Sequence, residues 1–116
     1  MVKQIFLAAI LAVIICAGGK VEAAEIYVGN SPATGYDCYV LTDSVRHRNE
    51  HSMLISFATL KMVNRYGDAQ YLDYTFYDLD GDYVDVEFSN SQGYRGLATA
   101  QDTPIEWAMY TVIRDY

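Results

Sequence analysis

Apolar and polar side chains alternate along residues 71–78 and again along residues 82–89. A period of two is typical of a β-strand with one buried face, and a slip of one residue would turn that face to solvent. A three-residue loop of Leu79, Asp80 and Gly81 would bring the two apolar sets together and place Gly81 at the left-handed position of such loops. The sequence therefore predicts a hairpin with these pairs: Leu72 with Phe88, Tyr74 with Val86, and Phe76 with Val84.

Three further segments are predicted to be strands, because Tyr, Thr, Val and Phe favour extended structure and the chain holds eleven tyrosines. They are residues 25–28, residues 37–42 and the apolar run 53–63. This last run also carries a helical stripe of Met53, Phe57, Leu60 and Val63, so periodicity leaves helix or strand open, and we favour strand. The polar residues 43–52 are expected to form a solvated loop.

A helix is predicted near the C-terminus. Asp102 or Thr103 can cap it, Pro104 suits its first turn, and Glu106 is well placed near the positive end of the helix dipole. Its apolar residues recur at intervals of three and four: Ile105, Ala108, Met109, Val112, Ile113 and Tyr116. Residues 94–99 would form a loop or short strand. We therefore expect an α+β fold, in which a twisted antiparallel sheet of about five strands is packed by one C-terminal helix.

The first residues have the features of an export signal. Lys3 precedes an apolar run over residues 5–16, and Val21 and Ala23 supply small side chains at the positions that a signal peptidase selects. We expect residues 1–23 to be a signal peptide. The run is too short to span a bilayer, which takes about 20 residues, so no transmembrane segment is expected in the mature chain.

Residues 24–116 would then be one exported domain, located in the periplasm, at the cell surface or outside the cell. A lipid anchor on Cys16 is the alternative, but bulky side chains precede that cysteine. The mature chain carries 6 basic and 14 acidic side chains, a formal charge of −8. Scattered basic residues among carboxylates argue against nucleic acid as a partner. Cys38 is the single cysteine of the mature chain, and we expect it to be buried and unreactive.

Two motifs suggest metals. Residues 47–51 spell HRNEH, the HxxEH pattern of one class of zinc peptidases, but that chemistry needs a helix to bring both imidazoles to one face. Asp78, Asp80, Asp82 and Asp85 resemble a calcium loop, but the glycine is misplaced and the final glutamate is missing. We therefore expect no bound metal and no cofactor.

Three tyrosines are the candidate binding residues. Tyr71, Tyr77 and Tyr83 fall on the face of the predicted hairpin opposite its apolar side, beside Asp85 and Glu87. Tyrosine has an apolar body and a polar tip, so such a face suits a contact surface. Ordinary cross-strand pairing is the alternative explanation.

A family resemblance rests on four segments: residues 39–45 (YVLTDSV), 71–76 (YLDYTF), 88–91 (FSNS) and 104–107 (PIEW). Through them, residues 25–116 resemble the small exported domains of the surface-adhesin protein E type. The resemblance implies an antiparallel sheet with a C-terminal helix on the bacterial envelope, adhesion to host proteins and haem binding. It supplies no functional residue, and this chain has no second mature cysteine to pair with Cys38.

These observations predict a non-enzymatic exported domain that binds a macromolecule or adheres to one. One alternative is a structural envelope protein that associates with itself. The other is a small metal-dependent hydrolase that uses His47, Glu50 and His51.

Overall fold

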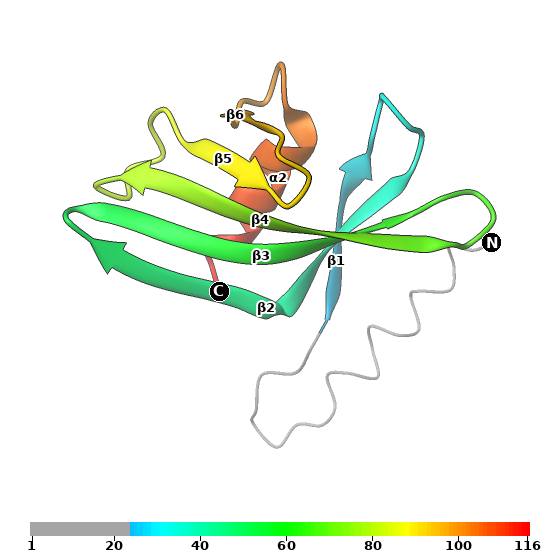
Figure 1. Cartoon of the computed structure of the whole chain (residues 1–116), viewed down its shortest axis with the longest axis horizontal. Helices are drawn as coiled ribbons and strands as arrows, with labels where there is room; N and C mark the ends of the chain where they lie inside the picture. The colour runs from blue at the N-terminus through cyan, green and yellow to red at the C-terminus, as the bar shows by residue number, and fades with distance from the viewer. Residues whose placement is uncertain (1–23) are drawn as a thin grey trace.

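A curled antiparallel sheet forms a half-barrel around one C-terminal helix (Figure 1). The computed structural model describes residues 24–116, so the predicted signal peptide and Cys16 lie outside the described residues. Six strands follow one another in sequence order across the sheet. The elements are β1 Glu25–Asn30, β2 Asp37–Glu50, β3 Met53–Val63, β4 Ala69–Leu79, β5 Glu87–Asn90, β6 Arg95–Leu97 and α2 Pro104–Ile113. The α+β class and the covering helix are confirmed, with β6 as the strand beyond the expected five.

The long strand β2 corrects one prediction. Residues 43–50 are not a solvated loop but continue the strand past a bulge, because Leu41 pairs with Thr59 and Arg46 already pairs with Phe57. Ser44 occupies the bulge, where its hydroxyl donates to the carbonyl of Leu41 at 2.6 Å and accepts from the amide of Thr59 at 2.8 Å. One side chain thus satisfies backbone groups that the irregular pairing would leave open. The bulge also changes which side of the sheet the following residues face.

The strand prediction for residues 53–63 is confirmed by β3. Ala58 and Leu60 point to the inner, helix-covered face and are buried, whereas Phe57 and Thr59 point to the outer face. The polar residues of the β2 extension are tied to this strand by the regular pairing of His47 with Ser56 and Arg48 with Ile55.

The register predicted for the β4–β5 hairpin is wrong. Phe76 pairs with Phe88 rather than with Val84, and residues 80–86 form a longer connection. Val84 is consequently 58% exposed, while Val86 is buried. The observed register differs from the predicted one by an even number of residues. Since strand side chains alternate with a period of two, Phe88 stays on the inner face in both registers.

The inner face and α2 enclose the core. Ile105, Met109 and Ile113 are buried as predicted, whereas Val112 is half-buried and Tyr116 is exposed. The helix approaches β1 at Gly29, where an added Cβ would lie 3.0 Å from the Cδ1 atom of Ile105. Gly29 has φ +137°, a conformation that a residue with a Cβ rarely adopts. Glycine is therefore needed for this close packing.

The sequence pattern missed the largest buried side chain of the helix. Tyr110 has no exposed surface and packs 5.2 Å, centroid to centroid, from the ring of Phe76. Thr103 precedes the helix as expected, but its hydroxyl donates to the carbonyl of Leu97 and accepts from the amide of Thr99 instead of capping α2.

Candidate functional site

The three candidate tyrosines do not share one face. Tyr71 is 57% exposed on the outer face, and Tyr77, half-buried, lies on the same face further along β4. Tyr83 belongs to the connection after β4 and packs on the helix side, 5.8 Å from Trp107 and 5.5 Å from Tyr110 between ring centroids. The placement of Tyr83 on the outer face was therefore wrong, because Tyr83 lies in the connection between β4 and β5 and not in a strand.

The outer face has its own small apolar cluster. Ile55 pairs with Tyr77 across β3 and β4, and Phe57 is the next residue of β3 on that face. The guanidinium of Arg48 lies 5.4 Å from the ring centroid of Phe57, and Ile55 is buried although it lies outside the main core. Strand pairing puts Arg46 opposite Phe57. An aromatic centre is thus bordered by arginines on the β2 side.

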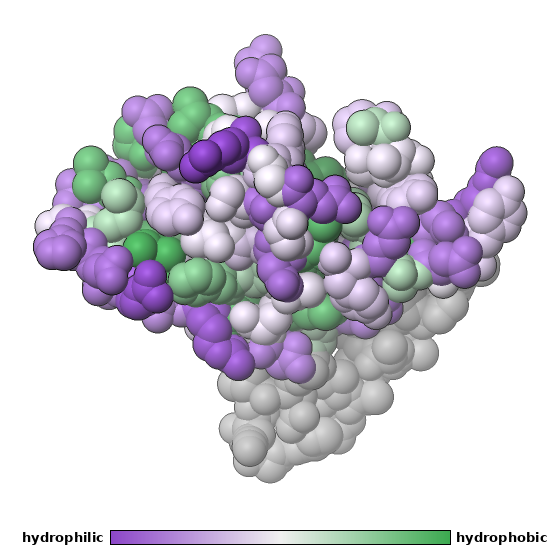
Figure 2. All heavy atoms as spheres, in the orientation of Figure 1, coloured by the Kyte–Doolittle hydropathy of each residue, from purple (hydrophilic) through white to green (hydrophobic). Residues whose placement is uncertain are grey.

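A third arginine lies on the same face on β6, which β5 separates from the β4 residue of the cluster. Arg95 of β6 pairs with Ser89, which pairs with Thr75, and Thr75 pairs with Phe57. Cross-strand partners share a face, so Arg95 belongs to the outer face. We call this surface the arginine–aromatic patch: Arg46, Arg48, Ile55, Phe57, Tyr77 and Arg95. In Figure 1 the helix α2 lies behind β3 and β4, and Figure 2 shows hydrophobic and hydrophilic residues interspersed over the side that faces the viewer.

The patch is unusual in its charge. It holds three of the six basic side chains of residues 24–116, in a domain with fourteen acidic ones. Two carboxylates lie next to it: Glu50, 3.7 Å from Arg48 on β2, and Glu87, which pairs with Tyr77. The other outer-face cation, Lys61, lies toward β1 and is neutralised by Glu25 at 3.0 Å.

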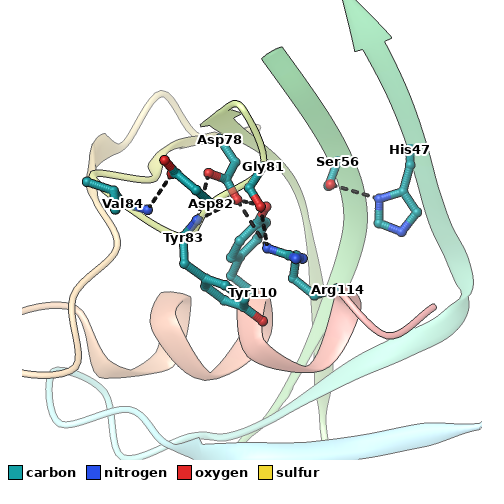
Figure 3. Close-up of polar contacts among 9 residues, drawn as sticks. All are labelled: His47, Ser56, Asp78, Gly81, Asp82, Tyr83, Val84, Tyr110 and Arg114. Carbon is teal, nitrogen blue, oxygen red and sulfur yellow. Dashed lines mark hydrogen bonds and ion pairs between the residues drawn. The ribbon is translucent and has the colours of Figure 1, made fainter. Parts of the chain in front are cut away.

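A buried carboxylate, Asp78, joins the end of β4 to the C-terminal end of α2 (Figure 3). Asp78 has no exposed surface, and its Oδ2 accepts the hydroxyl of Tyr110 at 2.5 Å. The amide of Tyr83 donates to the same carboxylate at 3.1 Å, and a guanidinium nitrogen of Arg114 lies 3.4 Å away. Arg114 also stacks 4.1 Å from the ring centroid of Tyr83. Burial first, and then the hydrogen bond to Asp78, raise the pKa of Tyr110, so its hydroxyl stays protonated.

The HxxEH segment is a strand and a turn rather than a helix. The ring nitrogen Nδ1 of His47 lies 2.8 Å from the hydroxyl of Ser56 on the inner side (Figure 3), and Glu50 points to the outer side with Arg48 at 3.7 Å. Residues 47 and 50 have opposite orientations because strand side chains alternate. His51 lies in the turn with φ 48°. In residues 24–116 no group of three or more His, Cys, Asp or Glu side chains is arranged to hold a metal ion.

Cys38 is buried as predicted, with 1% of its surface exposed and no disulfide. Burial, with a smaller contribution from the charge of Glu106, raises the pKa of the thiol to about 11. The thiolate is the reactive form, so at neutral pH the thiol is a poor nucleophile. Neither His47 nor Glu50 lines the pocket that Cys38 borders.

The sequence pattern did not reveal Arg46 and Arg48 as part of a surface, since residues 43–52 were expected to be a loop, and Arg95 lay in residues 94–99, a predicted loop or short strand without an assigned face. Ser44 was the available signal: a small hydroxyl residue between two alternating runs suits a bulge. None of the described helices is long and apolar enough to cross a membrane. No family model matches the chain, and neither a curated protein nor a solved structure matches it. The resemblance to surface-adhesin protein E therefore stays a prediction.

Proposed function

We propose that this chain is a non-enzymatic exported binding domain that docks an acidic segment of a partner protein on its arginine–aromatic patch. The observation that supports the proposal is the placement of Arg46, Arg48 and Arg95 on the same face as Phe57 and Tyr77 in an otherwise acidic domain.

The chemistry of the patch favours a protein partner. Arginine and tyrosine are enriched among the residues that dominate binding energy in protein interfaces, and their pairing with apolar neighbours excludes water from the contact. Arg48 stacks on Phe57 and forms an exposed ion pair with Glu50 at 3.7 Å, so a partner carboxylate would compete with Glu50 for two parallel hydrogen bonds to its planar guanidinium. A partner with alternating acidic and apolar side chains would satisfy both parts of the surface.

The non-enzymatic part of the proposal rests on separate contacts. His47 and Glu50 point to opposite sides of β2, and the Cys38 thiol is buried with a raised pKa. A metal-dependent hydrolase would need His47 as a metal ligand and Glu50 as a base on the same side of the chain, and a thiol hydrolase would need an activated Cys38. These positions supply neither arrangement.

Fluorescence anisotropy of a labelled peptide with alternating Glu and Leu residues tests the docking. We expect binding that weakens as salt is raised, because the charges are solvent-exposed. The double variant Arg48→Gln, Arg95→Gln should bind at least about tenfold more weakly. Arg65→Gln is the matched control, since Arg65 is exposed in the β3–β4 turn and stacks on Tyr66.

Equal binding by the wild type and the double variant would contradict the proposal, as would equal binding of a Lys–Leu peptide. Sedimentation velocity distinguishes docking of an acidic partner from self-association. A wild-type dimer that dissociates in the double variant would mean that a second copy of the chain, not an acidic partner, occupies the patch.

A further inference from the structure

A pocket of about 510 Å³ opens beside the first turn of α2, on the inner side of the sheet and away from the arginine–aromatic patch. It lies between the β1–β2 turn and the loop before α2, where Figure 2 shows the surface hollowed and hydrophobic residues at the bottom. Leu60, Met62 and Ile105 form apolar parts of its wall. Its size is within the range of small-molecule sites, and its lining is mainly apolar, as in most such sites.

One buried carboxylate borders this apolar space. Glu106 is 9% exposed, and its Oε2 accepts the hydroxyl of Tyr74 at 2.7 Å. Burial and the charge of Glu106 both raise the pKa of Tyr74, which keeps that hydroxyl protonated as a donor. In the described part of the chain no Lys, Arg or His forms an ion pair with Glu106. A carboxylate in this position is costly unless a donor or cation offsets its lost hydration.

The charges around the pocket have one sign. Among the described residues that line it, Glu106 and Asp102 are acidic and none is basic. The rings of Tyr74 and Tyr94 also border it, and the face of a tyrosine ring attracts cations. An anionic ligand would be repelled here, whereas a cation with an apolar body would meet complementary groups at both of its ends.

We propose that this pocket binds a small apolar amine, with its ammonium group donating to the Glu106 carboxylate. The apolar part would lie against Leu60, Met62 and Ile105. This ligand supplies the charge that the described residues do not, and it leaves the Tyr74 hydrogen bond in place.

Isothermal titration calorimetry at neutral pH with three probes of similar size tests the proposal: 2-phenylethylamine, 2-phenylethanol and 3-phenylpropionate. We expect the amine to bind about tenfold more tightly than the alcohol, since its hydrogen bond is assisted by charge, and the carboxylate to bind most weakly. Glu106→Gln keeps an acceptor for Tyr74 and should remove the preference for the amine while the alcohol still binds. Glu87→Gln, an exposed change on the outer face, should leave all three affinities unchanged.

A second readout does not depend on the Glu106 variant. Because Cys38 lines the pocket, the already slow labelling of this buried thiol by methyl methanethiosulfonate should become slower still when the amine is bound. Met62→Trp should fill the space and weaken binding of all three probes. Equal affinity of the wild type for amine and alcohol would overturn the proposal. So would the absence of binding by any probe, or a preference for the amine that survives in Glu106→Gln.

Discussion

Two carboxylates on the inner side of the sheet, Asp78 and Glu106, differ in how many hydrogen-bond and ion-pair partners the protein supplies to them. Asp78 lies beside the last turn of α2 and receives a tyrosine hydroxyl, a backbone amide and a guanidinium. Glu106 lies in the first turn and receives the hydroxyl of Tyr74, with no ion pair among the described residues. Both are nearly or wholly buried. Burial alone therefore does not distinguish a structural carboxylate from one that is available to a ligand.

The surroundings explain the difference. Asp78 is enclosed by Tyr83, Tyr110 and Arg114, which come from the β4–β5 connection and from the C-terminal end of the helix. It therefore joins segments that are distant in sequence. Glu106 lines an open pocket, where a ligand can reach its side chain. The account predicts large stability effects at Asp78 and a ligand effect at Glu106.

The largest effect is expected from Asp78→Ala. It leaves the Tyr110 hydroxyl, the Tyr83 amide and Arg114 without their common acceptor, and breaking a buried pair in this way costs about 3–5 kcal/mol. Urea unfolding followed by tryptophan fluorescence measures the change. Asp115→Ala, at an exposed C-terminal carboxylate, should stay within about 0.5 kcal/mol of the wild type. A similar small loss in Asp78→Ala would refute the structural role of Asp78.

Removing the two tyrosine hydroxyls compares the carboxylates directly. Tyr110→Phe should cost about 2 kcal/mol, since a hydrogen bond to a buried charge is lost. Tyr74→Phe should cost less than about 1 kcal/mol, because water in the pocket can replace the donor to Glu106. The same urea titrations measure both variants, and equal losses would show that the two sites are equivalent.

High pH should weaken the fold through the same hydroxyls. The folded-state pKa values of Tyr74 and Tyr110 are raised above 10.0, mainly by burial. Above pH 10 the unfolded chain therefore loses protons that the folded chain keeps, so the free energy of unfolding falls as pH rises. At pH 11 the loss should be about 1 kcal/mol for each tyrosine. Unfolding titrations between pH 8 and 11 should show a shallower decline in each Phe variant, whereas Tyr66→Phe should keep the wild-type slope.

The smallest stability effect is expected from Glu106→Gln. Glutamine retains an acceptor for Tyr74, and the loss of favourable interaction with the helix dipole is offset by easier burial of a neutral group. The free energy of unfolding should change by less than about 1 kcal/mol in urea. A loss as large as that of Asp78→Ala would make Glu106 a structural carboxylate and remove the contrast.

The sequence pattern predicted the features that depend on local alternation and periodicity. The burial of Cys38 and Tyr74, the strand at residues 53–63 and the helix contacts of Met109 and Ile113 are confirmed. The hairpin register could not be fixed, because a period of two fits any even shift. Tyr83 was placed wrongly because residues 80–86 form a connection with no strand alternation.

The interior carboxylate could not be found in the same way. Asp78 stands in a run of acidic residues that is typical of an exposed turn, and its partner Tyr110 is thirty-two positions away. The bulge at Ser44 likewise reverses the faces of β2 without changing the composition of the strand. The arginine–aromatic patch can be recognised only once it is known that the bulge turns Arg46 and Arg48 to the outer face.

Carbon-detected NMR of the side-chain carboxyl groups tests the central contrast most directly, by following Asp78 and Glu106 during one titration with 2-phenylethylamine. The account predicts that the Glu106 carboxyl resonance moves and saturates while that of Asp78 stays in place. A Glu106 resonance that does not move, or equal shifts of both resonances, would contradict it.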